Sequence, residues 1–159
     1  MITNAQEKDK EEILKLYRMQ IGRKFCPWDE HYPSEDEIEY DLSRDSLFVM
    51  KDDEGNIIAA ISIDSDEQVE ALEFWSKELS PGGELSRLAV HPDHQNKGIA
   101  PMLIKHCMEV LKERGYKSVH FLVNKNNEKA LRSYASLGIP KVGETFMYEQ
   151  PFFCYESRL

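Results

Sequence analysis

The stretch from Val90 to Ala100 combines a strand end, a polar turn and a helix start, and this combination suits anion binding. The strand should end at His91-Pro92, because proline cannot continue a strand ladder. A helix that opens after this turn leaves about four backbone N–H groups without partners, and its dipole adds positive potential. Gly98 and Ala100 carry little bulk, so a phosphate can approach the backbone. On its own, however, the pattern is better explained by a simple strand-to-helix turn with a glycine for geometry.

A second pattern lies further along the chain, at Asn127, Ala130, Tyr134 and Gly138. The spacing of three and four residues places Ala130 and Tyr134 on one face of a helix. Asparagine is a favoured residue at a helix start, and glycine is favoured just past a helix end. The pattern therefore predicts a short helix that holds the Tyr134 hydroxyl in a defined place.

Taken together, the two patterns resemble the GNAT superfamily of N-acetyltransferases. The pyrophosphate loop of that family reads Arg/Gln-x-x-Gly-x-Gly/Ala after a strand that ends in Val-x-Pro, and this chain has Gln95-Asn96-Lys97-Gly98-Ile99-Ala100 after Val90-His91-Pro92. The next family helix carries Asn-x-x-Ala-x-x-x-Tyr-x-x-x-Gly-Phe, which matches from Asn127 to Gly138, with Ile139 in place of phenylalanine. The order and the separation of about thirty residues also agree with the family.

The resemblance implies a fold of the α/β (α+β) class. Its mixed, mostly antiparallel sheet has splayed central parallel strands and helices on both faces, as in acyl-CoA N-acyltransferases, and residues 1–159 should form a single domain. Hydrophobic spacing agrees with this fold. It predicts helices at 9–20, from the Ser34 capping box, at 99–115 and at 127–138, and strands at 47–50, 57–63, 85–90, 118–123, 145–149 and 152–156. Within the segment 65–82, residues 70–75 read as a short helix or a strand, and a turn is expected at Gly82-Gly83. The buried stripe of the third helix is expected to hold Ile99, Met102, Leu103, His106 and Val110.

The resemblance also implies acetyl-CoA as co-substrate, bound between the strands at 85–90 and 118–123. The backbone of Leu88 and Val90 would pair with the pantetheine arm, and the amides of the Gln95–Ala100 loop would hold the pyrophosphate. The expected coenzyme-binding residues are Leu88, Ala89, Val90, Gln95, Asn96, Lys97, Gly98, Ile99, Ala100, Asn127 and Tyr134. Pro101 removes one amide donor from this loop, although proline suits a first helical turn.

In this family the acceptor amine attacks the thioester directly, which fits a sequence without a Cys/His or Ser/His pattern. Tyr134 occupies the position of the acid that protonates the departing thiolate, and the Val90 N–H is the family-like donor to the oxyanion. For the general base the first candidate is Glu84, at the start of the central strand, although an exposed carboxylate beside the glycine turn is equally compatible. Glu73 and His120 are weaker candidates.

Charge is distributed unevenly along the chain. The net charge is −9, but residues 28–84 contain eighteen acidic and three basic residues, whereas residues 85–159 contain seven acidic and eleven basic residues. Such a division fits either a solvated surface or two ligand regions of opposite preference. An acidic chain disfavours nucleic-acid binding, and no apolar run is long enough to span a membrane.

The three cysteines, Cys26, Cys107 and Cys154, are widely spaced. They predict neither a disulfide framework nor a metal site, and they fit a reducing cytoplasm. The sequence leaves monomer and homodimer open.

The leading interpretation is an N-acetyltransferase that acts on a small cationic amine in an acidic pocket, with Trp28, Tyr32, Trp75 and Phe152 as candidate lining residues. The alternatives are a protein or peptide acetyltransferase and a noncatalytic acyl-CoA-binding module. A phenylalanine–leucine pair at 121–122 stands where ribosomal-protein acetyltransferases of the family often carry a carboxylate, which disfavours a protein N-terminus as acceptor.

Overall fold

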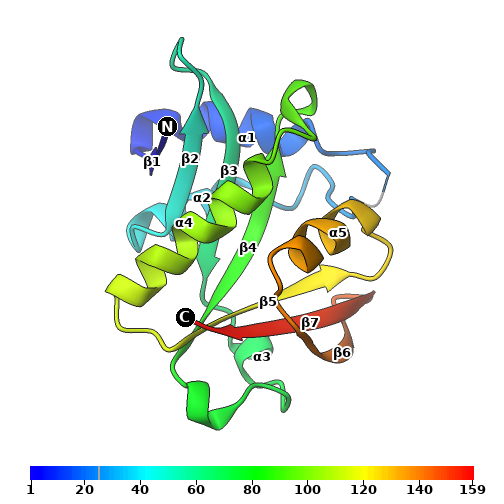
Figure 1. Ribbon diagram of the computed structural model, residues 1–159. Helices are drawn as coiled ribbons and strands as arrows, with labels where there is room; N and C mark the ends of the chain where they lie inside the picture. The colour runs from blue at the N-terminus through cyan, green and yellow to red at the C-terminus, as the bar shows by residue number, and fades with distance from the viewer. Residues whose placement is uncertain (25) are drawn as a thin grey trace.

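A computed structural model describes residues 1–24 and 26–159. Seven strands form one sheet in the order β1-β2-β3-β4-β5-β7-β6, and only the β4–β5 pair is parallel (Figure 1). The strands are β1 (Ile2–Asn4), β2 (Leu47–Lys51), β3 (Ile57–Asp64), β4 (Gly82–Val90), β5 (Ser118–Asn124), β6 (Lys141–Met147) and β7 (Gln150–Arg158). The α-helices are α1 (Lys10–Arg18), α2 (Glu35–Ser43), α3 (Glu67–Glu70), α4 (Ile99–Glu113) and α5 (Glu128–Ser136). The expected mixed sheet is confirmed.

Helices cover both faces of the sheet, and each face has its own apolar core (Figure 1). Strand β2 shows why, since alternate side chains of a strand point to opposite faces. Leu47 and Val49 join the core under α1 and α2, whereas Phe48 and Met50 join the core under α4 and α5. Every one of these four side chains is buried, so β2 lies inside the molecule on both faces.

The predicted helix starts are confirmed in their local chemistry. The Ser34 hydroxyl accepts from the Asp36 N–H, and the Glu37 carboxylate accepts from the Ser34 N–H, which completes a capping box at α2. The Asn127 side chain accepts from the Ala130 N–H at the start of α5. These caps fix where α2 and α5 begin, and therefore where their side chains meet the sheet.

The buried stripe of α4 differs from the expected one. Met102 has 53% of its surface exposed, and the buried positions are Ile99, Leu103, Ile104, Cys107 and Leu111. Apolar residues lie on two adjoining faces of this helix. The sheet covers the face that carries Leu103, Ile104 and Cys107, and it leaves Met102 exposed. The expectation for Met102 was therefore wrong.

Strand β4 begins at Gly82, so the glycine pair forms the start of the strand and not the expected turn. Close packing explains the glycines: a Cβ on Gly83 would lie 2.3 Å from Leu111 Cδ2, and a Cβ on Gly82 would lie 2.9 Å from His120 Nδ1. Pairing with β5 extends only from Gly82↔Ser118 to Glu84↔His120. Beyond Glu84 the two strands separate, as expected.

A bulge in β4 follows the point of separation. Ser62 pairs with Ser86, but Ala60 pairs with Ala89, so β4 has one extra residue opposite β3. Arg87 lies in this bulge at a φ of 50°, a conformation uncommon for residues other than glycine. A bulge bends a strand and changes the direction of its side chains, so the bulge in β4 determines the direction of the Arg87 side chain.

The segment before β4 contains the short helix α3 and a 3-10 turn at Lys77–Leu79. The expectation of a helix or a strand at residues 70–75 was wrong, because α3 ends at Glu70 and residues 71–75 lie outside any helix or strand. No helix within the described residues has the length and apolar character required to cross a membrane.

Candidate active site

Two adjoining cavities open where β4 and β5 separate. The larger has a volume of about 1050 Å³, and the smaller has a volume of about 390 Å³. Their common wall consists of Pro27, Trp28, Leu88, Asn127, Ala130 and Tyr134. Two ligands, one in each cavity, would therefore meet beside Leu88 and Tyr134.

The smaller cavity is basic. Arg23, Lys24, Lys129 and Arg132 line it, and no aspartate or glutamate of the described residues does. We call it the basic cavity. Its charge and the backbone donors described next suit an anionic ligand.

The amino terminus of α4 contributes backbone donors to the basic cavity. Gly98 precedes the helix at a φ of 75° and no side chain caps this end. The first turn contains no acidic residue, so the N–H groups of Ile99 and Ala100 remain available to an anion. Pro101, also on the wall, has no N–H, as the sequence indicates.

Three elements meet around one amide oxygen beside this helix start. Gln95 Oε1 accepts from Arg23 Nη2 at 2.6 Å and from Lys129 Nζ at 3.3 Å. The other terminal nitrogen of Arg23, Nη1, is buried and has no hydrogen-bond partner among the described residues. A buried guanidinium nitrogen without an acceptor is costly, and a phosphate oxygen would satisfy it. The donor set therefore fits a phosphate-bearing ligand.

Most of the predicted coenzyme-binding residues line the basic cavity. They are Leu88, Val90, Gln95, Asn96, Gly98, Ile99, Ala100, Asn127 and Tyr134. Ala89 is buried under the sheet, against the α1 and α2 core, and can contribute its backbone only. Lys97 is exposed and lies outside the cavity wall.

The backbone of Val90 faces the cleft. The next residue, His91, donates its N–H to Ile58 O at 2.8 Å on β3. Because antiparallel pairing alternates along a strand, Val90 points its own N–H and carbonyl away from β3. The carbonyl accepts from Gln20 Nε2 at 3.1 Å and from Gln95 Nε2 at 3.4 Å. A ligand that pairs with Val90 would therefore use its N–H first.

The larger cavity is acidic. Its wall contains seven carboxylate side chains, which are Asp29, Glu37, Asp64, Asp66, Glu67, Glu84 and Glu149, and a single arginine, Arg87. We call it the acidic cavity. Six of the seven acids come from residues 28–84, so the acidic part of the sequence does face a cleft.

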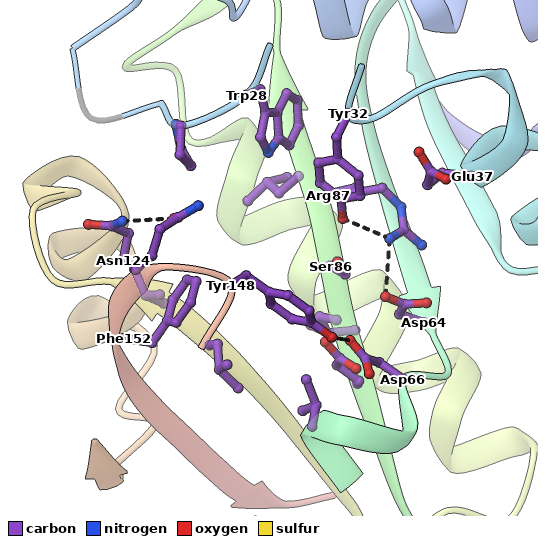
Figure 2. A pocket seen from close by; sticks show the side chains of 18 of the residues that line it. Trp28, Tyr32, Glu37, Asp64, Asp66, Ser86, Arg87, Asn124, Tyr148 and Phe152 are labelled. Atoms are coloured by element: carbon purple, nitrogen blue, oxygen red, sulfur yellow. Dashed lines mark hydrogen bonds and ion pairs between the residues drawn. The ribbon is translucent and has the colours of Figure 1, made fainter. Parts of the chain in front are cut away.

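Arg87 is neutralised within the wall (Figure 2). Its guanidinium lies 2.8 Å from Asp41 Oδ1 and 3.1 Å from Asp64 Oδ2, and it donates to the Tyr32 hydroxyl at 3.2 Å. Asp41 is fully buried and also accepts from the Ser62 hydroxyl. The network fixes Tyr32 and Asp64 in place and leaves the net potential of the cavity negative.

Glu84 is the least exposed of the acids on this wall, with 5% of its surface accessible. Its Oε1 is buried and has no hydrogen-bond partner among the described residues. Burial raises the pKa of Glu84 to about 9, and the nearby charges of Asp64 and Asp66 raise it further in the same direction. The structure therefore excludes the exposed carboxylate that the sequence left open.

Tyr134 lies on the wall that the two cavities share. Its ring packs against Phe121 at a centroid distance of 4.3 Å and against Tyr155 at 6.0 Å. Burial raises the pKa of its hydroxyl, so Tyr134 keeps its proton at neutral pH. Tyr134 is thus a core residue that also lies on the wall of the cleft.

Aromatic residues line the acidic cavity as expected, with one exception. Trp28, Tyr32 and Phe152 lie on its wall. Trp75 instead packs on His120 at a centroid distance of 4.5 Å and donates to Val69 O, so the expectation for Trp75 was wrong. Across the cavity, the Tyr148 hydroxyl donates to Asp66 Oδ2 at 2.7 Å and links the β6–β7 turn to the start of α3 (Figure 2).

Several wall residues were not predicted from the sequence. Arg23 and Lys129 join the basic cavity from opposite ends of the chain, and Arg87 joins the acidic one through its bulge. For Arg87, an arginine within a largely buried strand was a usable signal. For Arg23 and Lys129, only the tertiary fold brings the side chains to the loop.

Comparison with known proteins identifies a family. The model of the acetyltransferase (GNAT) family matches residues 13–139. N-acetyltransferase 8 of Rattus norvegicus is 33% identical over 64 residues, which are 40% of this chain and 29% of that protein. Mycothiol acetyltransferase of Thermomonospora curvata is 33% identical over 78 residues, which are 48% of this chain and 26% of that protein. The chain thus spans less than a third of the length of either relative.

Solved structures share the fold over nearly the whole chain. A phosphinothricin acetyltransferase of Sinorhizobium meliloti, in complex with AcCoA, superposes with a TM-score of 0.79 at 17% identity and covers 100% of this chain and 88% of that one. The ribosomal-protein-S18-alanine N-acetyltransferase of Escherichia coli has a TM-score of 0.74 at 18% identity, with coverage of 99% and 92%.

Proposed function

Because the chain belongs to the acetyltransferase (GNAT) family, we propose that it transfers an acetyl group from acetyl-CoA to the primary amine of a small cationic molecule. The observation that carries this proposal is the pair of adjoining cavities of opposite charge. A coenzyme with phosphates suits the basic cavity, and an ammonium suits the acidic one. The two reacting groups would meet at the wall that contains Leu88 and Tyr134.

The coenzyme's phosphates would bind at the start of α4. The N–H groups of Ile99 and Ala100 would donate to the phosphates, and Arg23 and Lys129 would turn from Gln95 to add charge-assisted hydrogen bonds. The loss of a donor at Pro101 is offset by the buried Nη1 of Arg23, which has no other acceptor among the described residues.

When bound, the coenzyme supplies an acetyl thioester whose thiolate is the leaving group. Direct attack by the amine is favoured over an enzyme nucleophile, because Cys26 is the cysteine that lines the basic cavity and burial raises its pKa. The Val90 N–H, which faces the cleft, would donate to the carbonyl oxygen as negative charge develops. Tyr134 would give its proton to the departing sulfur and would regain one from the attacking nitrogen, which carries an extra proton after it adds to the carbonyl.

Glu84 would remove the proton from the substrate ammonium. With a pKa of about 9 its carboxyl is protonated at neutral pH in the free protein. A bound cation has the opposite effect to the surrounding acids, since an opposite charge favours the ionised form. The arriving ammonium would therefore ionise Glu84 and create the base that deprotonates it.

A small acceptor is favoured over a peptide by the link between Tyr148 and Asp66. Their hydrogen bond spans the acidic cavity between the β6–β7 turn and α3. An extended peptide would have to displace this link, whereas a compact amine can lie beneath it. The noncatalytic alternative predicts binding of acetyl-CoA without turnover.

The test begins with binding of acetyl-CoA. A concentration of 100 times Kd should stabilise the protein by about 2.7 kcal/mol, visible as a rise in Tm. Glu149→Gln, on the acidic wall, serves as the matched control and should leave this shift unchanged, whereas Lys129→Gln should reduce it. Absence of any shift with the unsubstituted protein would contradict the coenzyme assignment.

A further inference from the structure

Proton removal from Glu84 presents a problem that the cavities do not solve. The carboxyl is buried, and during turnover the amine would lie in the acidic cavity against Glu84 while the coenzyme lies in the basic one. Glu84 must nevertheless lose one proton to solvent in each cycle, if the proposed function holds. An exit that leaves through the protein, away from the two ligands, would meet this need.

His120 is the partner of Glu84 on β5, as Asp64 is on β3. Glu84 and His120 form the last pair of the parallel β4–β5 register, immediately before the strands separate. His120 Nε2 lies 3.0 Å from Glu70 Oε1 on α3. One donor atom from each of Glu84, His120 and Glu70 lies within 4.8 Å of the other two. Such spacing allows direct transfer or transfer through a single bridging water.

The imidazole of His120 is held in place by its packing. It is 1% exposed, and the Trp75 ring lies against it at a centroid distance of 4.5 Å. On the other side, a Cβ at Gly82 would approach Nδ1 to 2.9 Å, so only glycine leaves room for the ring. A histidine fixed between two groups that exchange protons is well suited to relay them, because its ring nitrogens can both accept and donate a proton.

Glu70 forms the solvent end of this chain of groups. Its side chain is 44% exposed, and neither Glu70 nor His120 belongs to the wall of the acidic or the basic cavity. Along α3, Glu67, Gln68 and Val69 do line the acidic cavity. The helix thus presents one side to the substrate cavity and carries Glu70 on another.

We propose that Glu84, His120 and Glu70 form a proton exit that ionises Glu84 when the ammonium binds, without opening the substrate cavities. The Glu84 O–H bond breaks as the His120 imidazole gains an N–H bond, and the imidazole passes a proton to Glu70, which releases it to water. The amine N–H bond then breaks as an O–H bond forms again on Glu84. Every step moves one proton and leaves no net change on the three side chains.

The test uses Glu70→Gln in the full chain. Glutamine keeps the size of the side chain and can still accept a hydrogen bond from His120, but it cannot carry a proton to solvent. We expect kcat to fall about tenfold, with KM for the amine unchanged. A small diffusible base such as imidazole should restore most of the lost rate by accepting the proton from His120.

Glu78→Gln is the matched control. Glu78 is exposed, lies eight residues further on, belongs to neither cavity wall, and its substitution makes the same change in charge. It should turn over at the wild-type rate, with no response to imidazole beyond that of the wild type. A Glu70→Gln enzyme as fast as wild type, or one whose loss imidazole cannot restore, would overturn the proton exit. Inactivity of the wild type with every amine would instead overturn the proposed function.

Discussion

The buried carboxyl of Glu84 should make the stability of the protein depend on pH in a recognisable way. In the unfolded chain this group titrates near its ordinary pKa of 4.5, whereas in the folded protein it keeps its proton up to about 9. Between these values the folded state binds more protons than the unfolded state. The free energy of unfolding must therefore fall as pH rises through this window and level off above pH 9.

The expected magnitude follows from the width of the window. Each pH unit within this window lowers the free energy of unfolding by about 1.4 kcal/mol. Titration of Glu84 alone should therefore lower it by about 3 kcal/mol between pH 6 and pH 8. Glu84→Gln removes this pH dependence of the free energy of unfolding, because glutamine does not titrate. The substitution also places an amide in a buried site, but that cost is the same at both pH values.

Urea unfolding of wild type and Glu84→Gln at the two pH values measures the difference directly. All other titrating groups are common to both proteins and cancel in the comparison. From pH 6 to pH 8, the free energy of unfolding should fall by about 3 kcal/mol more in the wild type than in the variant. Equal losses in the two proteins would refute the conclusion that Glu84 is buried as a neutral acid.

Three further predictions concern the two cavities and the wall between them. Tyr134→Phe should lower kcat by about a hundredfold with little change in amine KM, measured by release of free thiol, whereas unchanged kcat would exclude Tyr134 as the acid. Arg23→Gln should weaken CoA binding about tenfold by calorimetry and leave amine binding intact, and equal affinity would show that this side chain does not reach the phosphates. Asp41→Asn should cost about 3–5 kcal/mol of unfolding free energy, because it leaves the buried Arg87 short of charge compensation; a loss below about 1 kcal/mol would contradict this role.

Local patterns were enough to predict much of the fold. The Ser34 and Asn127 caps, the hairpin of β2 and β3 and the helix start at Gly98 each depend on a few neighbouring residues, and all are observed. The buried face of α4 was harder to predict from the sequence. Met102 and Ile104 are both apolar, and only the position of the sheet determines which of them is buried. The Gly82 start of β4 depends on a close approach to His120, a contact between strands that sequence spacing does not show.

The candidate site likewise has parts that follow from local sequence motifs and parts that depend on the tertiary fold. The loop at Gly98 and the hydroxyl of Tyr134 belong to contiguous motifs, and the structure brings both to the basic cavity. Arg23 and Lys129 are separated by more than one hundred residues and meet only through the fold. The burial of Glu84 depends on neighbours from three elements, so its raised pKa could not be inferred from a carboxylate next to two glycines.

The central claim is that an anionic coenzyme and a cationic amine react where the two cavities meet. Steady-state release of CoA from acetyl-CoA, measured with pairs of primary amines matched in size, tests it most directly. One member of each pair should carry a second cationic group and the other a neutral group in its place. The account predicts that the dicationic member has the higher kcat/KM and that added salt reduces its advantage, because salt screens the acidic cavity. Turnover that is equal for both members, or faster for the neutral one, would contradict it.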